Sequence, residues 1–114
     1  MIQIYHNPRC GKSRNCLAFI ENTKQEFEVI PYLTQNPSFD ELQTLLQQLD
    51  LKPLQLIRTK EKIWIENYKD KSLTDDEIVQ AMVENPILIE RPIVVKNGKA
   101  IIGRDLEAVA GFLE

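Results

Sequence analysis

Apolar and polar residues follow two different periods in the first third of the chain. Residues 2–5 (Ile-Gln-Ile-Tyr) form a short β-rich run, which predicts a first strand that Pro8 brings to an end. The next apolar residues recur at helical spacing and predict a helix from about residue 12 to 22. Residues 27–32 predict a second strand, and a right-handed crossover makes the two strands parallel.

Two capping boxes mark helix starts in the middle of the chain. In the pairs Ser38/Glu41 and Thr74/Glu77, the hydroxyl and the carboxylate satisfy each other's free amides. Pro53 suits the first turn of a further short helix, and residues 63–68 are also predicted to be helical. The first capped helix is expected to have an apolar stripe of Leu42, Leu45, Leu46 and Leu49, and the second to turn Ile78, Ala81 and Met82 inward. The short helix at Pro53 is expected to carry Leu54, Ile57 and Arg58.

The last quarter of the chain contains the strongest hairpin signal. Residues 92–96 and 99–102 flank Asn97-Gly98, which supplies the two positive-φ positions of a type I′ turn. Residues 105–113 predict a final helix with Leu106, Val109, Ala110 and Leu113 on one side.

The order of these elements indicates an α/β protein of the thioredoxin-like class. It combines a β-α-β unit with a β-β-α unit in one mixed sheet, with a helical insertion between them. At 114 residues the chain is expected to form a single domain over residues 1–114. In such folds a proline in the cis form begins the third strand beside the cysteine, and Pro92 stands at that place.

Composition and charge narrow the possible functions. The chain is 43% hydrophobic with a net charge of −3 and no basic stripe, which argues against nucleic-acid binding. No apolar run approaches the ~20 residues of a membrane span, and the N-terminus does not resemble a secretory signal. A cytoplasmic location is therefore expected, where the two cysteines would be reduced thiols. The protein is also expected to be a monomer.

The setting of Cys10 favours its thiolate, which is the nucleophilic form of cysteine. Cys10 is expected at the start of a helix, where unpaired amides and the dipole stabilise negative charge. Arg9 and Arg14 add positive charge nearby and suggest a local anion site. Gly11 would let the backbone turn tightly and bring amides towards the sulfur or a bound anion. His6 could supply a hydrogen bond or a charge, or it could only cap local backbone groups at the end of the strand.

Other uses of cysteine do not fit this pattern. A two-cysteine redox motif needs a second cysteine where Ser13 stands. Cys16 lies about 9 Å further along the helix, and its apolar neighbours indicate a buried small hydrophobe. A phosphatase-like loop would need arginine where Cys16 stands, and two cysteines with one histidine make no zinc site at these spacings. Cys10 is therefore a single nucleophile, and any disulfide that it forms needs an external thiol.

Three segments of the chain stand out together: His6-Asn7-Pro8-Arg9-Cys10 with Ser13-Arg14-Asn15, then Leu56-Ile57-Arg58, and then the run from Asn85 to Val95. In combination they resemble the glutaredoxin-coupled arsenate reductase family, and most of all its bacterial arsenate-reductase-like subgroup. The resemblance implies that Cys10 is the catalytic cysteine, that His6 helps the thiolate to form, and that Arg58, Arg91 and Arg104 bind an oxyanion. Gly11 and Arg14 are further candidates for substrate binding. Gly103-Arg104-Asp105 replaces the Cys-Arg-Pro of the well-studied enzymes.

The resemblance also implies a reaction. Arginine forks suit a tetrahedral dianion such as arsenate, since each fork can bind two of its oxygens. The thiolate would form a cysteine–arsenic adduct, glutathione would act as the external reductant, and glutaredoxin would resolve the mixed disulfide. No bound cofactor and no metal are expected.

Two alternatives remain open from the sequence. Cys10-Gly11-Lys12-Ser13 also resembles a one-cysteine glutaredoxin motif, which predicts a thiol oxidoreductase that acts on glutathione mixed disulfides. The same fold resembles a bacterial regulator that binds RNA polymerase, which would make this chain a non-enzymatic interaction protein. That regulator carries two cysteines in a C-x-x-C motif, which this chain lacks.

Overall fold

Four short strands form one mixed sheet in the computed structural model, which describes all 114 residues. The strands are β1 (Ile2–Tyr5), β2 (Phe27–Ile30), β3 (Ile93–Lys96) and β4 (Lys99–Ile102). They lie in the order β2-β1-β3-β4, with β1 parallel to β2 and with β3 antiparallel to both β1 and β4. The predicted parallel crossover and hairpin are therefore confirmed.

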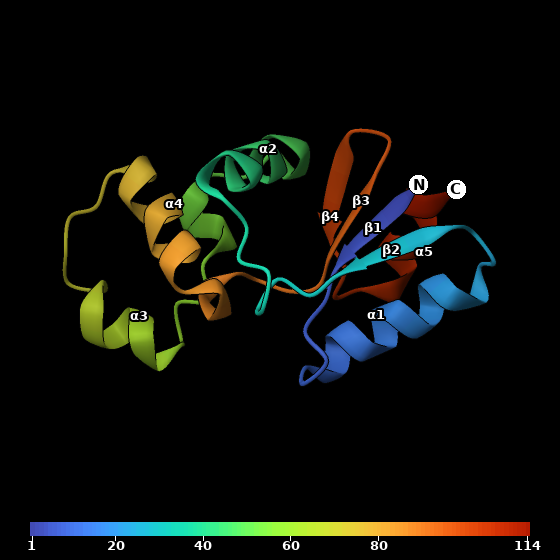
Figure 1. Cartoon of the computed structure of the whole chain (residues 1–114), viewed down its shortest axis with the longest axis horizontal. Helices are drawn as coiled ribbons and strands as arrows, with labels where there is room; N and C mark the ends of the chain where they lie inside the picture. Colours follow the sequence, from blue (N-terminus) through green and yellow to red (C-terminus); the bar gives the residue numbers. More distant parts are fainter. The chain divides into compact units, whose positions relative to one another are not determined.

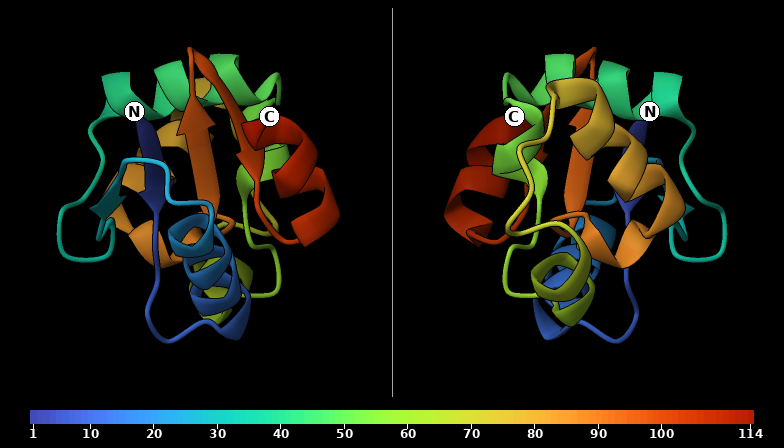
Figure 2. Two further views of the ribbon diagram at one scale, coloured as in Figure 1. Left: turned by 90° about the vertical axis from the view of Figure 1, so that its right-hand side faces the viewer. Right: turned by 90° about the vertical axis from the view of Figure 1, so that its left-hand side faces the viewer.

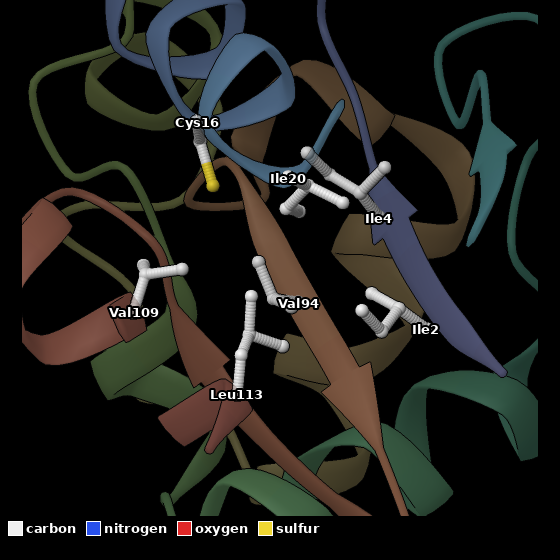
Figure 3. Packing of buried hydrophobic residues seen from close by; sticks show 7 residues of the cluster. All are labelled: Ile2, Ile4, Cys16, Ile20, Val94, Val109 and Leu113. Atoms are coloured by element: carbon white, nitrogen blue, oxygen red, sulfur yellow. The ribbon is translucent and has the colours of Figure 1, made fainter. Parts of the chain in front are cut away.

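Helices α1 (Gly11–Asn22) and α5 (Leu106–Leu113) close a hydrophobic core over one face of this sheet. Because side chains alternate along a strand, Ile2 and Ile4 of β1 point to the same face. Figure 3 shows both residues turned towards Val94 of β3, together with side chains from the two helices. The seven buried members of the cluster are Ile2, Ile4, Cys16, Ile20, Val94, Val109 and Leu113.

The hairpin of β3 and β4 has the turn that its sequence predicts, and Figure 2 shows it in orange and red leading into α5. Asn97 and Gly98 have φ angles of 55° and 76°, as a type I′ turn requires. Leu106 is expected on the same side of the final helix as Val109 and Leu113, but its side chain is 38% exposed. Leu106 is the first residue of α5, and the residues of this helix that are buried in the core are Val109 and Leu113.

Residues 36–90 form a compact helical unit, separate from the unit made by residues 1–35 and 91–114. Helices α2 and α4 pack against each other within it (Figure 1). Both predicted capping boxes are present, with the Ser38 hydroxyl accepting from the Glu41 amide at 3.1 Å and the Thr74 hydroxyl from the Glu77 amide at 3.2 Å. The elements of this unit are α2 (Phe39–Leu49), η1 (Pro53–Leu56), α3 (Lys62–Asn67), α4 (Asp75–Glu84) and η2 (Pro86–Leu88).

The short helix at Pro53 differs from its prediction. It is a 3-10 helix that ends at Leu56, so Ile57 and Arg58 lie outside it. Ile57 instead forms an isolated antiparallel bridge with Ile89, and the Arg58 amide donates to the Leu88 carbonyl at 2.7 Å. Long-range pairing has therefore overridden the local helical tendency at these residues.

The sheet order, the covering helices and the helical insertion together make a thioredoxin-like α/β fold. A cis peptide bond joins Arg91 to Pro92 immediately before β3, as that topology led us to expect. None of the helices has the length and apolar character needed to cross a membrane. The expectation of a single domain stays a prediction.

Candidate active site

The loop between β1 and α1 is built around Asn7, which is only 2% exposed. Its side-chain oxygen accepts from the Arg9 amide at 2.9 Å, and its carbonyl accepts from the Cys10 amide at 3.1 Å. This pair of bonds folds the chain back within three residues, as asparagine often does in turns. The loop ends at Cys10, which is the N-cap of α1 with an extended backbone (φ −96°, ψ 122°).

Cys10 has a thiol pKa below its ordinary value. Burial by itself would raise this pKa, but hydrogen bonds to the sulfur from the Ser13 amide, the Arg91 side chain and the Lys12 amide outweigh burial, and the charge of Arg91 adds to them. The two amides belong to the first turn of α1, where they have no partner within the helix. Both the helix start and an arginine therefore stabilise the thiolate.

The arginine that acts on the sulfur is Arg91. Arg9 and Arg14, which the sequence placed nearest to Cys10, are not among the groups that lower its pKa. The Nε and Nη1 atoms of Arg91 are shielded from solvent and have no hydrogen-bond partner. Buried donors of this kind are costly to leave unpaired, and a guanidinium prefers oxygen atoms of an anion as partners. Arg91 thus has two nitrogen donors without hydrogen-bond partners while it acts on the Cys10 sulfur.

His6 lies at the end of β1 and bonds to Ser13 of α1. Its Nδ1 lies 2.6 Å from the Ser13 hydroxyl oxygen, which also accepts from the Asn7 amide at 3.0 Å. Burial lowers the pKa of His6 below its ordinary value, and the nearby positive charge of Arg14 lowers it further. His6 is accordingly a neutral imidazole at pH 7.

Arg14 and Gly11 have different settings from those that the sequence suggested. The Nη1 of Arg14 donates to the Pro8 carbonyl at 2.9 Å, which holds this side chain along the loop. Gly11 does not have a positive φ, and a β-carbon added there would meet only Arg14 Nη2 at 3.7 Å. The tight-turn reason for a glycine at this position is therefore wrong, because Gly11 is an ordinary first residue of α1. That Arg14 and Gly11 bind substrate stays a prediction.

The other two predicted oxyanion ligands lie in different units. Arg104 is exposed and follows Gly103, whose amide donates to the Pro92 carbonyl at 2.8 Å. Arg58 belongs to the unit formed by residues 36–90. Its Nε and Nη2 each lie 3.2 Å from a Glu61 carboxylate oxygen, so an intra-unit ion pair already occupies part of its guanidinium. Their roles stay predictions.

Cys16 is a core residue and has none of the features that activate Cys10. It is fully buried among the side chains of the hydrophobic cluster (Figure 3). Burial raises the pKa of its thiol to about 11, which keeps it protonated and unreactive at neutral pH. The interpretation of Cys16 as a small hydrophobe is confirmed.

A pocket of about 370 Å³ lies next to the Cys10 loop within the sheet unit. It is lined by His6, Asn7, Pro8 and Arg9 from the loop and by Pro31, Leu33 and Thr34 after β2. The exposed Arg9 side chain is its only charged group. No group of three or more His, Cys, Asp and Glu side chains has an arrangement that could hold a metal ion.

Two polar residues of this site were not identified from the sequence. Ser13 is completely buried and Asn7 nearly so, and their hydrogen bonds tie the loop to the first turn of α1. The sequence offered one signal for each of them. Ser13 occupies the place of the second cysteine in a two-cysteine motif, and Asn7 lies between the histidine and a proline in a short turn.

The chain therefore belongs to the class of thioredoxin-like proteins in which a single cysteine with a lowered pKa lies at a helix start beside an arginine. Comparison with known proteins identifies the family. The model of the ArsC family matches residues 5–112. This chain therefore belongs to the ArsC family, which confirms the resemblance found in the sequence.

Individual relatives agree with this result over nearly the whole chain. The uncharacterised protein YfgD of Escherichia coli (strain K12) is 46% identical over 110 residues, which cover 95% of this chain and 92% of that protein. The arsenate reductase of Neisseria meningitidis serogroup A is 39% identical over 114 residues, or 98% and 97% of the two chains. The solved structure of an arsenate reductase from Vibrio cholerae has a TM-score of 0.91 and 48% identity, covering 96% and 95%.

Proposed function

We propose that this protein reduces arsenate to arsenite through Cys10, with glutathione and glutaredoxin as external reductants. The observation that carries the proposal is the pairing of Cys10 with Arg91. The guanidinium lowers the pKa of the thiol and keeps two buried nitrogen donors without partners. A tetrahedral oxyanion would satisfy these donors and would bring its central atom close to the sulfur. The name of the Neisseria relative supports arsenate as this oxyanion.

The reaction would begin with attack of the Cys10 thiolate on arsenic(V). A sulfur–arsenic bond forms, and one arsenate oxygen leaves as hydroxide or, once protonated, as water. The positive charge of Arg91 offsets the repulsion between an anionic nucleophile and an anionic substrate. The family resemblance adds Arg58 and Arg104 as further oxyanion ligands.

A second thiol would then complete the reduction. Glutathione thiolate attacks the Cys10 sulfur, and the electron pair of the sulfur–arsenic bond stays on arsenic, which leaves as arsenite. Cys10 is now in a mixed disulfide with glutathione, and a glutaredoxin thiolate takes the glutathionyl group and releases Cys10. Cys16 cannot replace the external thiol, because it is buried and its pKa is about 11. This route needs a glutathione pool, so the cytoplasm stays the expected location.

The test is NADPH consumption coupled to glutathione reductase, glutathione and glutaredoxin, with and without arsenate. We expect turnover that requires arsenate, disappears in Cys10→Ser and persists in the matched control Cys16→Ala. Arg58→Ala and Arg104→Ala should each weaken arsenate-dependent turnover. Arsenate-independent turnover of a glutathione mixed disulfide, insensitive to both arginine variants, would instead establish the thiol oxidoreductase. Absence of any turnover with active glutaredoxin would contradict both enzymatic functions.

A further inference from the structure

The hydrogen bonds around Ser13 constrain where the protons of His6 can lie. The Ser13 hydroxyl has one proton to donate and two lone pairs. The Asn7 amide donates to one lone pair at 3.0 Å, and His6 Nδ1 lies 2.6 Å from the same oxygen. Ser13 has no solvent exposure, so water does not compete for these bonds.

Two assignments of the His6–Ser13 bond can be compared. If Nδ1 carried a proton and donated it, the Ser13 hydroxyl proton would be buried with no acceptor, since His6 and Asn7 are its only partners. If Ser13 donates to a bare Nδ1, the hydroxyl proton, the Nδ1 lone pair and the Asn7 amide are all paired. Leaving a buried donor unpaired costs about 1–3 kcal/mol, so the second assignment is the stable one. The single proton of the neutral ring then lies on Nε2.

We propose that Ser13 is a positioning residue whose hydroxyl holds His6 as the neutral tautomer protonated on Nε2. An imidazolium carries protons on both nitrogens and would break the bond from Ser13 to Nδ1. His6 therefore brings a hydrogen-bond donor, not a positive charge, to the loop that carries Cys10. The positive charge at the sulfur comes from Arg91.

The charged surroundings of His6 act in the same direction. Arg14 of α1 is cationic and opposes a second positive charge on the ring. Arg9 lines the same pocket from the loop, while Pro31, Leu33 and Thr34, which line it after β2, have no titratable group. No carboxylate is among the residues that line this pocket with His6.

Ser13 thus has two separate contributions to the site. Its backbone amide is one of the groups that lower the pKa of Cys10, and its hydroxyl bonds to His6. Ser13→Ala keeps the amide and removes only the hydroxyl, so it separates the two. The inference rests on the proposed function only in taking an oxyanion as the ligand that the His6 N–H would meet.

The experiment is nitrogen-15 NMR of the ring of His6, the only histidine in the chain. In the unmodified protein at pH 7 we expect an unprotonated Nδ1 and a protonated Nε2. In Ser13→Ala we expect a mixture of tautomers and a titration midpoint shifted upward. Ser13→Thr, which keeps a hydroxyl, should restore the original signature. Ser38→Ala, which removes a hydroxyl that caps α2, should leave the His6 signals unchanged.

Cysteine alkylation distinguishes positioning from general loosening of the structure. In Ser13→Ala the rate at which Cys10 reacts with iodoacetamide at pH 7 should change less than about twofold, because its amide and arginine donors remain. A protonated Nδ1 in the unmodified protein would overturn the inference even if Ser13→Ala fails to fold. The inference would also be overturned if Ser13→Ala shifted the pH midpoint of Cys10 alkylation by as much as it shifts the titration midpoint of His6. Neither readout uses arsenate, so failure of the proposed function would leave this result standing.

Discussion

The sulfur of Cys16 occupies the space that a side chain at Gly103 would need. A β-carbon added to Gly103 would lie 2.8 Å from Cys16 Sγ and 3.3 Å from both Pro92 Cγ and Val94 Cγ2. Gly103 does not have a positive φ, so close packing and not backbone conformation requires glycine here. The same residue bonds to the Pro92 carbonyl and precedes Arg104, so this contact fixes the chain next to a predicted oxyanion ligand.

Gly103→Ala should destabilise the protein by about 1–3 kcal/mol, because a buried methyl group would be forced against a core sulfur. Urea unfolding measures the change. Gly111→Ala is the matched control, since a β-carbon there meets nothing within 4 Å and alanine favours helix by up to about 1 kcal/mol. In a Cys16→Ala background Gly103→Ala should lower the free energy of unfolding by less. An equal loss of stability in both backgrounds would show that the Cys16 sulfur is not the obstacle.

The two cysteines should differ strongly in reactivity in the native protein. The pKa of Cys10 lies below its ordinary value, whereas burial raises that of Cys16 to about 11. At pH 7 only about one Cys16 in 10⁴ is therefore a thiolate. Mass spectrometry after iodoacetamide treatment should find one label in the folded protein and two in denaturant. Equal labelling of both thiols in the folded state would contradict the assignment.

Arg91→Ala should raise the pKa of Cys10, because it removes both a hydrogen bond to the sulfur and a nearby positive charge. Arg91→Lys keeps the positive charge but replaces the planar guanidinium with a single ammonium group, so it should raise the pKa of Cys10 less than Arg91→Ala does. The pH dependence of Cys10 alkylation measures both variants. Arg9→Ala, with an exposed side chain that does not act on the sulfur, is the matched control. A larger shift in the control than in Arg91→Ala would be inconsistent with this site.

The stability of the protein should depend on His6 at mildly acidic pH. The pKa of His6 is lowered in the folded state, first by burial and then by Arg14. Its contribution to stability is therefore complete above the unfolded value of about 6.5 and is lost as the pH falls through the folded value. The free energy of unfolding, relative to His6→Gln, should decline from pH 7.5 to pH 5. The carboxylates titrate in both proteins and cancel in the difference. A relative stability that rises on acidification would reverse the sign and reject this account.

The sequence alone determined most of the element order and much of the chemistry at Cys10. The capping boxes at Ser38 and Thr74 and the Asn97-Gly98 turn are short-range signals, because residues within four positions satisfy them. The cysteine at a helix start is equally local, and its amide partners follow from that position. The order of strands and helices then led to the thioredoxin-like fold and to the cis bond before Pro92.

Only the tertiary structure decided which side chains meet. The arginine that acts on Cys10 is Arg91, far along the chain, and not its sequence neighbours Arg9 and Arg14. Pairing with Ile89 kept Ile57 out of the predicted helix. The bond between His6 and Ser13 depends on how the loop folds back over α1. Each of these outcomes rests on contacts between separate segments, which no local preference encodes, so they follow only when the chain is folded.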